Sequence, residues 1–221
     1  MSATARAAGA AEVTAAVGRM CAAVRQALTA ALEALERGDL DAARAVMAGD
    51  AEIDRQEEEI EHLCLRLLAA RERGGPPELD VRAIAAGFKV VTDLERVGDH
   101  AAAIARSALR MEGERPIPPF VDIQRLGALA GEMLDGAVAA FSTGDAAAAR
   151  EVAARDDGVD ALYDQIFREL VTYMLDDRTS VRQATHLLFV ASALERVGDH
   201  ATNVGEWVIF AVTGRRVELN D

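Results

Sequence analysis

Four pairs of acidic residues, each with a spacing of four, are the features of this sequence that could do chemistry. On a helix, residues four apart lie on one face with their Cβ atoms about 5–6 Å apart. Such carboxylates repel each other, and the repulsion grows when they are partly buried. Four pairs at matching positions in two repeats therefore favour a compensating cation, with pairing to nearby arginines as the alternative. The pairs are Asp50/Asp54, Glu95/Asp99, Asp156/Asp160 and Glu195/Asp199.

A cation held by carboxylate oxygens would be a hard one, so we expect Mg²⁺, Mn²⁺, Ca²⁺ or iron, in a divalent or trivalent state. Zinc is less favoured because no cluster of cysteines and histidines accompanies the acidic pairs. His100 and His200 each follow the last aspartate of a pair, so they point about 100° away around the helix. They are expected to support the metal ligands from behind or to pack between helices, and not to bind the metal directly. Asn203 could add an oxygen ligand in the second half only, because Ala103 stands at the matching position of the first.

The acidic pairs belong to an internal repeat. The octet LERVGDHA occurs at 94–101 and again at 194–201, an offset of 100 residues. Upstream, a pattern of Gly-Asp, Arg, Asp and Asp at 38–54 returns at 144–160, an offset of 106. The difference falls before each octet, where the first half carries RERGGPPELD and the second a shorter DDRTS turn. Each half is therefore predicted to be a helix, a Gly-Asp turn, a helix, a second turn and a long helix.

Helices must position these side chains. Alanine supplies 46 of the 221 residues and has the highest helix propensity, whereas runs of β-branched or aromatic residues are few. The five prolines lie in two short stretches, at 76–77 and 116–119, where they interrupt helix-like segments. The sequence predicts tails at 1–11 and 214–221 and six helices, at 12–37, 39–72, 78–112, 120–143, 145–176 and 179–213.

The predicted fold class is all-α, with two tandem, sequence-related three-helix bundles. Three amphipathic helices make the smallest up-down-up bundle with a shared core. The first bundle is predicted to span 12–112 and the second 120–213. The proline-rich stretch at 113–119 is the predicted linker between them.

The overall composition limits the partners of the chain. Its 24 basic and 37 acidic side chains give a net charge of −13, which argues against nucleic acid as a partner. No apolar run approaches the roughly 18 residues that span a bilayer, and residues 1–13 lack the apolar core of a secretion signal. Cys21 and Cys64 are expected to be reduced, buried thiols, with a disulfide or metal ligation as alternatives. We therefore expect an acidic cytoplasmic protein without membrane insertion.

The doubled octet, the upstream Asp-x-x-x-Asp pairs and the two three-helix repeats together resemble the PhoU family of phosphate-uptake regulators, over residues 12–213. The resemblance implies a dimeric cytoplasmic protein that is not an enzyme and that negatively regulates the phosphate-starvation response. It would connect the phosphate-specific ABC transporter, through its ATPase PstB, to the sensor histidine kinase PhoR. It also implies multinuclear clusters of metal ions (Mg, Mn, Fe or Zn), held by these residues: Asp50, Asp54, Glu95, Asp99, Asp156, Asp160, Glu195 and Asp199.

Two departures from the family pattern bear on whether the two sites are equivalent. Ala103 stands where the family often has an asparagine such as Asn203, and Ala193 precedes the second octet where Asp93 precedes the first. The equivalence of the sites and their metal count therefore stay open.

Two other functions are compatible with parts of the pattern. An accessory protein of another transporter would keep the family and change the partner, and gene neighbours would separate the two. A di-metal carboxylate enzyme would use two Glu-x-x-His motifs on facing helices, and the sequence holds a single one, Glu59-x-x-His62. No Walker loop, GxGxxG fingerprint or nucleophile–histidine arrangement offers a start for other enzymatic chemistry.

Overall fold

Every element of regular structure in the described part of the chain is helical, which confirms the all-α prediction. The computed structural model describes residues 3–72, 80–114, 117 and 120–219. The elements are α1 (Ala3–Arg37), α2 (Leu40–Glu72), α3 (Val81–Arg110), α4 (Phe120–Thr143), α5 (Ala146–Ala153), α6 (Asp156–Asp176), the short 3₁₀-helix η1 (Arg178–Ser180) and α7 (Val181–Thr213).

The two Gly-Asp steps end one helix and begin the next, as predicted. Gly38 and Gly144 adopt positive φ angles of 63° and 65°, which a residue without Cβ reaches at little cost. Asp39 Oδ1 then accepts a hydrogen bond from the backbone N–H of Ala42 at 3.0 Å, and Asp145 Oδ1 accepts two from the first turn of α5. These aspartates satisfy backbone donors that have no partner inside the helix.

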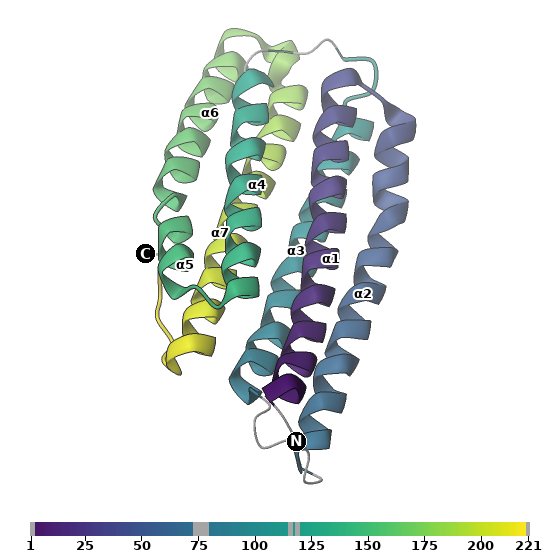
Figure 1. Cartoon of the computed structure of the whole chain (residues 1–221). Helices are drawn as coiled ribbons and strands as arrows, with labels where there is room; N and C mark the ends of the chain where they lie inside the picture. The colour runs from purple at the N-terminus through teal and green to yellow at the C-terminus, as the bar shows by residue number, and fades with distance from the viewer. Residues whose placement is uncertain (1–2, 73–79, 115–116, 118–119, 220–221) are drawn as a thin grey trace.

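The helices form two three-helix bundles that lie side by side (Figure 1). The first bundle contains α1, α2 and α3, and the second contains α4, the α5–α6 rod and α7. Helix α3 packs along α7, and α1 packs against α4. Figure 1 shows that α3 and α7 run in opposite directions. The repeated architecture is thus confirmed, whereas the boundaries 12–112 and 120–213 stay predictions.

The two bundles share one hydrophobic core, because their buried apolar side chains form a single continuous cluster. Helices α3 and α7 contribute matching residues 100 positions apart. Since these residues recur every three or four positions, they form one apolar stripe on each helix. The fully buried pairs are Val90/Val190, Leu94/Leu194, Val97/Val197, Ala101/Ala201 and Ile104/Val204. The leucine, valine and alanine of each octet therefore fix the helix that carries the octet's carboxylates.

The structure corrects three of the predicted helix limits. Residues 3–11, expected as a tail, belong to α1, in keeping with the high helix propensity of their alanines. The helix expected at 145–176 is interrupted at Ala154 and Arg155, where Arg155 N and Gly158 N donate to carbonyls three residues back. Helix α3 runs from 81 to 110 instead of 78 to 112, with Asp80 as its N-cap. Residues 73–79, 115–116 and 118–119, which include most of the two proline-rich stretches, lie outside the described residues.

None of the helices within the described ranges is both long and apolar enough to cross a membrane. Cys21 and Cys64 are buried and form no disulfide with each other, as expected for core thiols.

Candidate functional site

The first acidic cluster (Asp50, Asp54, Glu95 and Asp99) lies between α2 and α3. Burial raises the pKa of Asp50, and the nearby carboxylates of Asp54 and Asp99 raise it further, while Arg106 opposes the shift. Burial also raises the pKa of Glu95, with Asp99 as the next largest cause. The fold therefore brings the two predicted pairs of the first repeat into one electrostatically coupled group.

The second acidic cluster (Asp156, Asp160, Glu195 and Asp199) lies between α6 and α7. Burial raises the pKa of Asp156 to about 6, and Asp160 and Asp199 add to the shift. The pKa values of Glu195 and Asp199 are also raised, chiefly by burial, and their neighbours Asp199 and Asp160 contribute next. The negative charges of Asp160 and Asp199 thus make Asp156 harder to ionise, which is the repulsion that the sequence predicts.

Asp156 of the second cluster has a carboxylate oxygen without a hydrogen-bond partner among the described residues. Its Oδ1 atom is buried, and no donor among the described residues forms a hydrogen bond with it. A buried oxygen without a partner costs free energy that a hydrogen bond or a cation would recover. Asp156 is also the first residue of α6, since the interruption at Ala154 and Arg155 places a helix N-terminus here.

The glycine of each octet allows the aspartate of the neighbouring helix to come close. A Cβ atom on Gly198 would lie 3.0 Å from Asp156 Oδ1, and one on Gly98 would lie 3.1 Å from the Ile53 side chain and 3.6 Å from Asp50 Oδ1. Neither glycine was among the predicted site residues, although both occupy the same place in the repeated octet. They shape both clusters by letting helices α2 and α6 approach the octet helices.

Arginine pairing, the alternative to a cation, applies in part to the first cluster. The Arg96 guanidinium lies 3.4 Å from Glu95 and 3.2 Å from Asp99, on the exposed side of α3. In the second cluster, Arg196 lowers the pKa values of Glu195 and Asp199 without outweighing burial. The arginines thus offset part of the repulsion, and the carboxylate pKa values named above remain raised.

The first cluster has a fifth carboxylate that the repeat pattern could not reveal. Burial raises the pKa of Glu57, which interacts with Thr92, and Glu57 in turn raises the pKa of Glu95. Its counterpart 106 residues later is Tyr163, so Glu57 does not belong to a matched acidic pair of the repeat. The two clusters are therefore chemically different.

The two octet histidines pack between α3 and α7, as predicted. Their ring centroids lie 5.6 Å apart. His200 Nδ1 lies 3.0 Å from Asp93 Oδ1, and Asn203 Nδ2 donates to the same oxygen at 3.3 Å. Asn203 therefore binds Asp93 of the first repeat, and its expected role as an extra oxygen ligand of the second cluster is not supported by this contact.

The donor sets suit a hard cation. Each cluster offers partly buried carboxylate oxygens that repel one another. The second cluster also holds the Oδ1 atom of Asp156, which has no hydrogen-bond partner among the described residues. Among the residues that the structure describes, no three side chains of His, Cys, Asp or Glu converge closely enough to enclose a metal ion as they stand. Which residues bind a metal thus stays a prediction.

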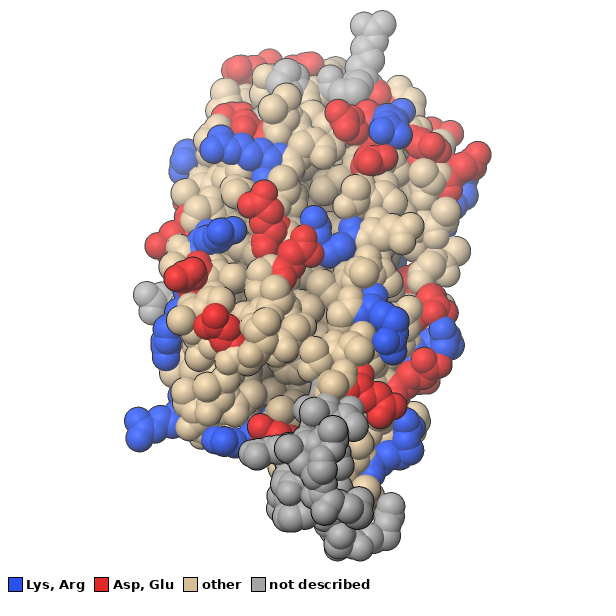
Figure 2. Space-filling model, in the orientation of Figure 1, with Lys and Arg blue, Asp and Glu red and all other residues tan. Residues whose placement is uncertain are grey.

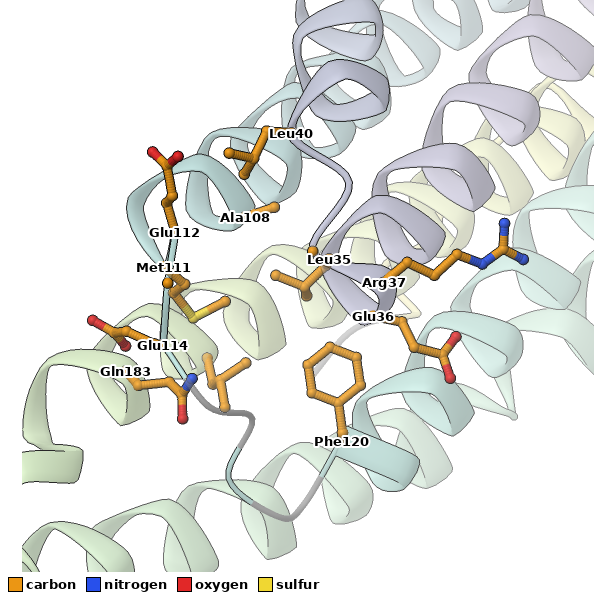
Figure 3. Close-up of a pocket in the computed structure, with 13 residues that line it drawn as sticks. Leu35, Glu36, Arg37, Leu40, Ala108, Met111, Glu112, Glu114, Phe120 and Gln183 are labelled. Carbon is orange, nitrogen blue, oxygen red and sulfur yellow. The ribbon is translucent and has the colours of Figure 1, made fainter.

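Other hollows lie away from the clusters. A cavity of about 200 Å³ opens where the ends of α1 and α3 meet the starts of α4 and α7, and none of the eight motif carboxylates lines it (Figure 3). Its walls include Leu35, Met111 and Phe120. Glu59 and His62, the residues of the lone Glu-x-x-His motif, line a separate groove beside α1, where Glu59 is paired with Arg55.

Charges of both signs are scattered over the face shown in Figure 2, which α1 and α4 form at the front. This face carries no large area of a single sign.

Comparisons with known proteins identify relatives of both halves of the chain. The PhoU domain model matches residues 17–108 and 123–208. A phosphate-specific transport system accessory protein PhoU homolog from Xylella fastidiosa is 38% identical over 190 residues, which cover 86% of this chain and 79% of that protein. A crystal structure of PhoU from Pseudomonas aeruginosa aligns with a TM-score of 0.86 and 36% identity, covering 94% of this chain and 99% of that one. The phosphate transport system regulatory protein PhoU from Streptococcus pneumoniae aligns with a TM-score of 0.86 and 27% identity, covering 95% and 97%.

Proposed function

The chain belongs to the PhoU family, and we propose that it is a cytoplasmic accessory protein of phosphate transport that represses the phosphate-starvation response. The observation that carries this proposal is the match of the PhoU domain to both halves, together with two relatives named for the phosphate transport system. The relatives are named as accessory and regulatory proteins, which favours a binding protein over an enzyme.

The proposed mechanism is binding and release between two partners. One partner is the ATPase of the phosphate ABC transporter, of the PstB type, and the other is a sensor histidine kinase of the PhoR type. A homodimer is part of the proposal. The two bundles around one core supply a scaffold with several helix faces on which such partners could dock.

We further propose that metal ions, divalent or trivalent, belong to this function. The residues that would hold them are Asp50, Asp54, Glu95 and Asp99 between α2 and α3, and Asp156, Asp160, Glu195 and Asp199 between α6 and α7. A bound cation would supply positive charge between facing carboxylates and would join the two helices of each pair. The raised pKa values and the unpartnered oxygen of Asp156 support this proposal.

Deletion of the gene tests the regulatory function. In phosphate-rich medium, the deletion strain should express a phosphate-starvation reporter at a high level, and the wild-type gene supplied in trans should restore repression. An Asp41→Ala gene serves as a matched control, because the Asp41 side chain is 95% exposed on α2 and outside both clusters. Reporter output that is the same with and without the gene, at high and low phosphate, would overturn the proposal.

The identity of the transporter is tested separately. The purified chain should bind the ATPase of the phosphate transporter, and gene neighbours should include that transporter or a kinase–regulator pair. Binding to the ATPase of a different transporter, with no effect on the starvation reporter, would assign the chain to that other system.

A further inference from the structure

A groove lined by arginines runs between α3 and α7. Its volume is about 440 Å³. Arg106 and Arg110 line it from α3, and Arg196 and Phe189 line it from α7. Neither Arg106 nor Arg110 forms an ion pair with a carboxylate of the described residues, although the chain has a net charge of −13. The charge of Arg106 acts on Asp50, and that of Arg196 acts on Glu195 and Asp199, and in each case the carboxylate pKa stays raised. Three cations along one groove of so acidic a protein therefore favour an anionic ligand.

The groove exists because the contact between α3 and α7 is asymmetric. On one side of the helix pair, Asp93 binds His200 and Asn203. The positions related by 100 residues are Ala193, His100 and Ala103, and all three line the groove. Two alanines replace the larger polar side chains that fill the space on the other side. The repeat thus leaves one side filled and the other open.

The matching face of the second repeat already holds a peptide segment. Glu206 and Trp207 stand 100 residues after Arg106 and Ser107, and Ser107 also lines the groove. The C-terminal segment after Gly214 lies against this face. The backbone N–H of Leu219 donates to Glu206 Oε1 at 2.8 Å, and the Arg216 guanidinium lies 3.9 Å from the other oxygen of Glu206.

The charges at the two related faces are opposite. An acidic residue, Glu206, meets a segment that carries Arg215 and Arg216, and the guanidinium of Arg216 covers the Trp207 ring at 4.6 Å from its centroid. In the open groove, Arg106 takes the place of Glu206. A segment with acidic residues in place of the two arginines would therefore be the complementary ligand.

We propose that the groove between α3 and α7 binds an extended acidic segment of a partner protein. Acidic side chains of the segment pair with Arg106, Arg110 and Arg196. An apolar side chain of the segment contacts the ring of Phe189, which is accessible because this residue is 59% exposed. This inference rests on the α3–α7 contact and the C-terminal segment, and it holds whichever transporter or kinase the protein serves.

The dimensions of the groove favour a peptide over a free oxyanion. From His100 to Arg110 the lining of α3 covers about 15 Å at 1.5 Å per residue. That length fits about four or five residues of extended chain, at about 3.3 Å each. A free phosphate would engage one or two arginines and would leave Phe189 without a contact.

The test uses two peptides taken from the chain's own C-terminal segment. The natural sequence of residues 214–220 is GRRVELN, and the charge-reversed probe is GEEVELN. Fluorescein-labelled GEEVELN is titrated with the full-length protein at low salt, and binding is followed by fluorescence anisotropy. We expect saturable binding that is about tenfold tighter than that of GRRVELN, as expected from two or more exposed charge pairs. Binding should weaken as salt rises to about 300 mM.

The double variant Arg106→Glu/Arg110→Glu replaces two positive charges of the groove with negative charges, as Glu206 has at the related face. Its affinity for GEEVELN should be lower than that of the wild type by about tenfold or more, and its affinity for GRRVELN should be higher. The control Arg125→Glu/Arg150→Glu makes the same change of net charge at exposed positions outside the groove and should behave as the wild type. Circular dichroism melting curves establish that both variants are folded.

Three results would overturn the proposal. The first is wild-type protein that does not prefer GEEVELN over GRRVELN. The second is equal loss of the acidic peptide in the groove variant and in the control, since that would reflect net charge alone. The third is inorganic phosphate that displaces GEEVELN at equal concentration, because this would assign the arginines to a small oxyanion.

Discussion

His200 Nδ1 lies 3.0 Å from Asp93 Oδ1 and thereby joins the long helix of the second repeat to that of the first. Asn203 donates to the same oxygen at 3.3 Å. All three side chains are partly buried, so the carboxylate of Asp93 is a shared acceptor at the contact between α3 and α7. The corresponding carboxylate is missing from the second repeat, where Ala193 stands at that position. Two positions of the repeated pattern, Asp93/Ala193 and Ala103/Asn203, thus distinguish the two halves at their common interface.

Replacing Asp93 by alanine should lower the free energy of unfolding by about 1–3 kcal/mol, because His200 and Asn203 would lose their common acceptor in a partly buried place. Urea denaturation measures the change. Asp41→Ala is the control, and it should change stability by no more than about 0.5 kcal/mol because Asp41 is a surface residue. Equal stability of Asp93→Ala and the wild type would show that the contact contributes nothing.

Adding Mn²⁺ or Mg²⁺ to chelator-stripped protein should raise its melting temperature. A metal ion that binds only the folded state adds about 2.7 kcal/mol to the free energy of unfolding when its concentration is a hundred times its Kd. For a chain of this length, that raises the melting temperature by roughly 5–10 °C. The double variant Glu195→Gln/Asp199→Asn should lose the part of this rise in melting temperature that comes from the second cluster. The double variant Glu95→Gln/Asp99→Asn should lose the part that comes from the first. Differential scanning fluorimetry with and without metal follows both.

The metal-free variants separate a cation from arginine pairing. Because the pKa values of Glu195 and Asp199 are raised by burial and by neighbouring carboxylates, neutral side chains should relieve repulsion and stabilise the metal-free protein. Arginine pairing alone would give the opposite result. Asp164→Asn is the control, since Asp164 is exposed on α6 and lies 3.8 Å from Arg168. A wild type indifferent to metal, with destabilised variants, would refute the metal sites.

Gly198→Ala should destabilise the protein by about 1–3 kcal/mol, since its Cβ would lie 3.0 Å from Asp156 Oδ1 and 3.2 Å from Val159. The displaced carboxylate should also reduce the thermal shift that metal produces. Gly158→Ala in the neighbouring helix α6 is the matched control, because nothing lies within 4 Å of its Cβ. That variant should be more stable by about 0.5–1 kcal/mol. Equal effects of the two substitutions would contradict the close approach at Gly198.

The repeat in the sequence was sufficient to predict the all-α fold and the grouping of the acidic pairs within each half. Matching carboxylates at a helical spacing must share a face, and the doubled octet places two such faces in equivalent bundles. The contact between Asp93 and His200 could not be predicted from the repeat, because it joins residues 107 positions apart and depends on how α3 crosses α7. Glu57 was not predicted as part of the first cluster, because the matching position of the second repeat is Tyr163 and not an acidic residue.

The interruption of the helix at Ala154 and Arg155 was also not predicted, since neither of these two residues is a glycine or a proline. In the first repeat, Ala48 and Gly49 occupy the matching positions and α2 continues through them. Local propensity would favour the break at the glycine, and the structure has it at the arginine instead. Tertiary packing of α5 and α6 against α7 therefore decides this detail, as it often overrides propensity.

Cys21 and Cys64 should react slowly with iodoacetamide in the native protein. Burial raises their pKa values to about 12 and about 11. At pH 8, a pKa of about 12 leaves about one thiolate in 10⁴, whereas a free thiol with a pKa near 8.5 is about one quarter ionised. Labelling followed by mass spectrometry should show fast modification of both thiols only after guanidinium unfolding. Rapid labelling of Cys21 without denaturant would contradict its place in the core.

The single tryptophan reports on the C-terminal segment. Arg216 covers the Trp207 ring, and Glu206, which is 8% exposed, holds both Arg216 and the backbone of Leu219. Arg216→Ala should expose the ring to water and shift its emission to longer wavelength. Glu206→Ala should produce the same shift and should also make the segment after Gly214 more sensitive to carboxypeptidase, because the backbone of Leu219 loses its acceptor. Arg215→Ala removes an equal charge from the neighbouring exposed position and should leave the emission unchanged. If all three variants emit as the wild type does, the segment does not lie against α7 in solution.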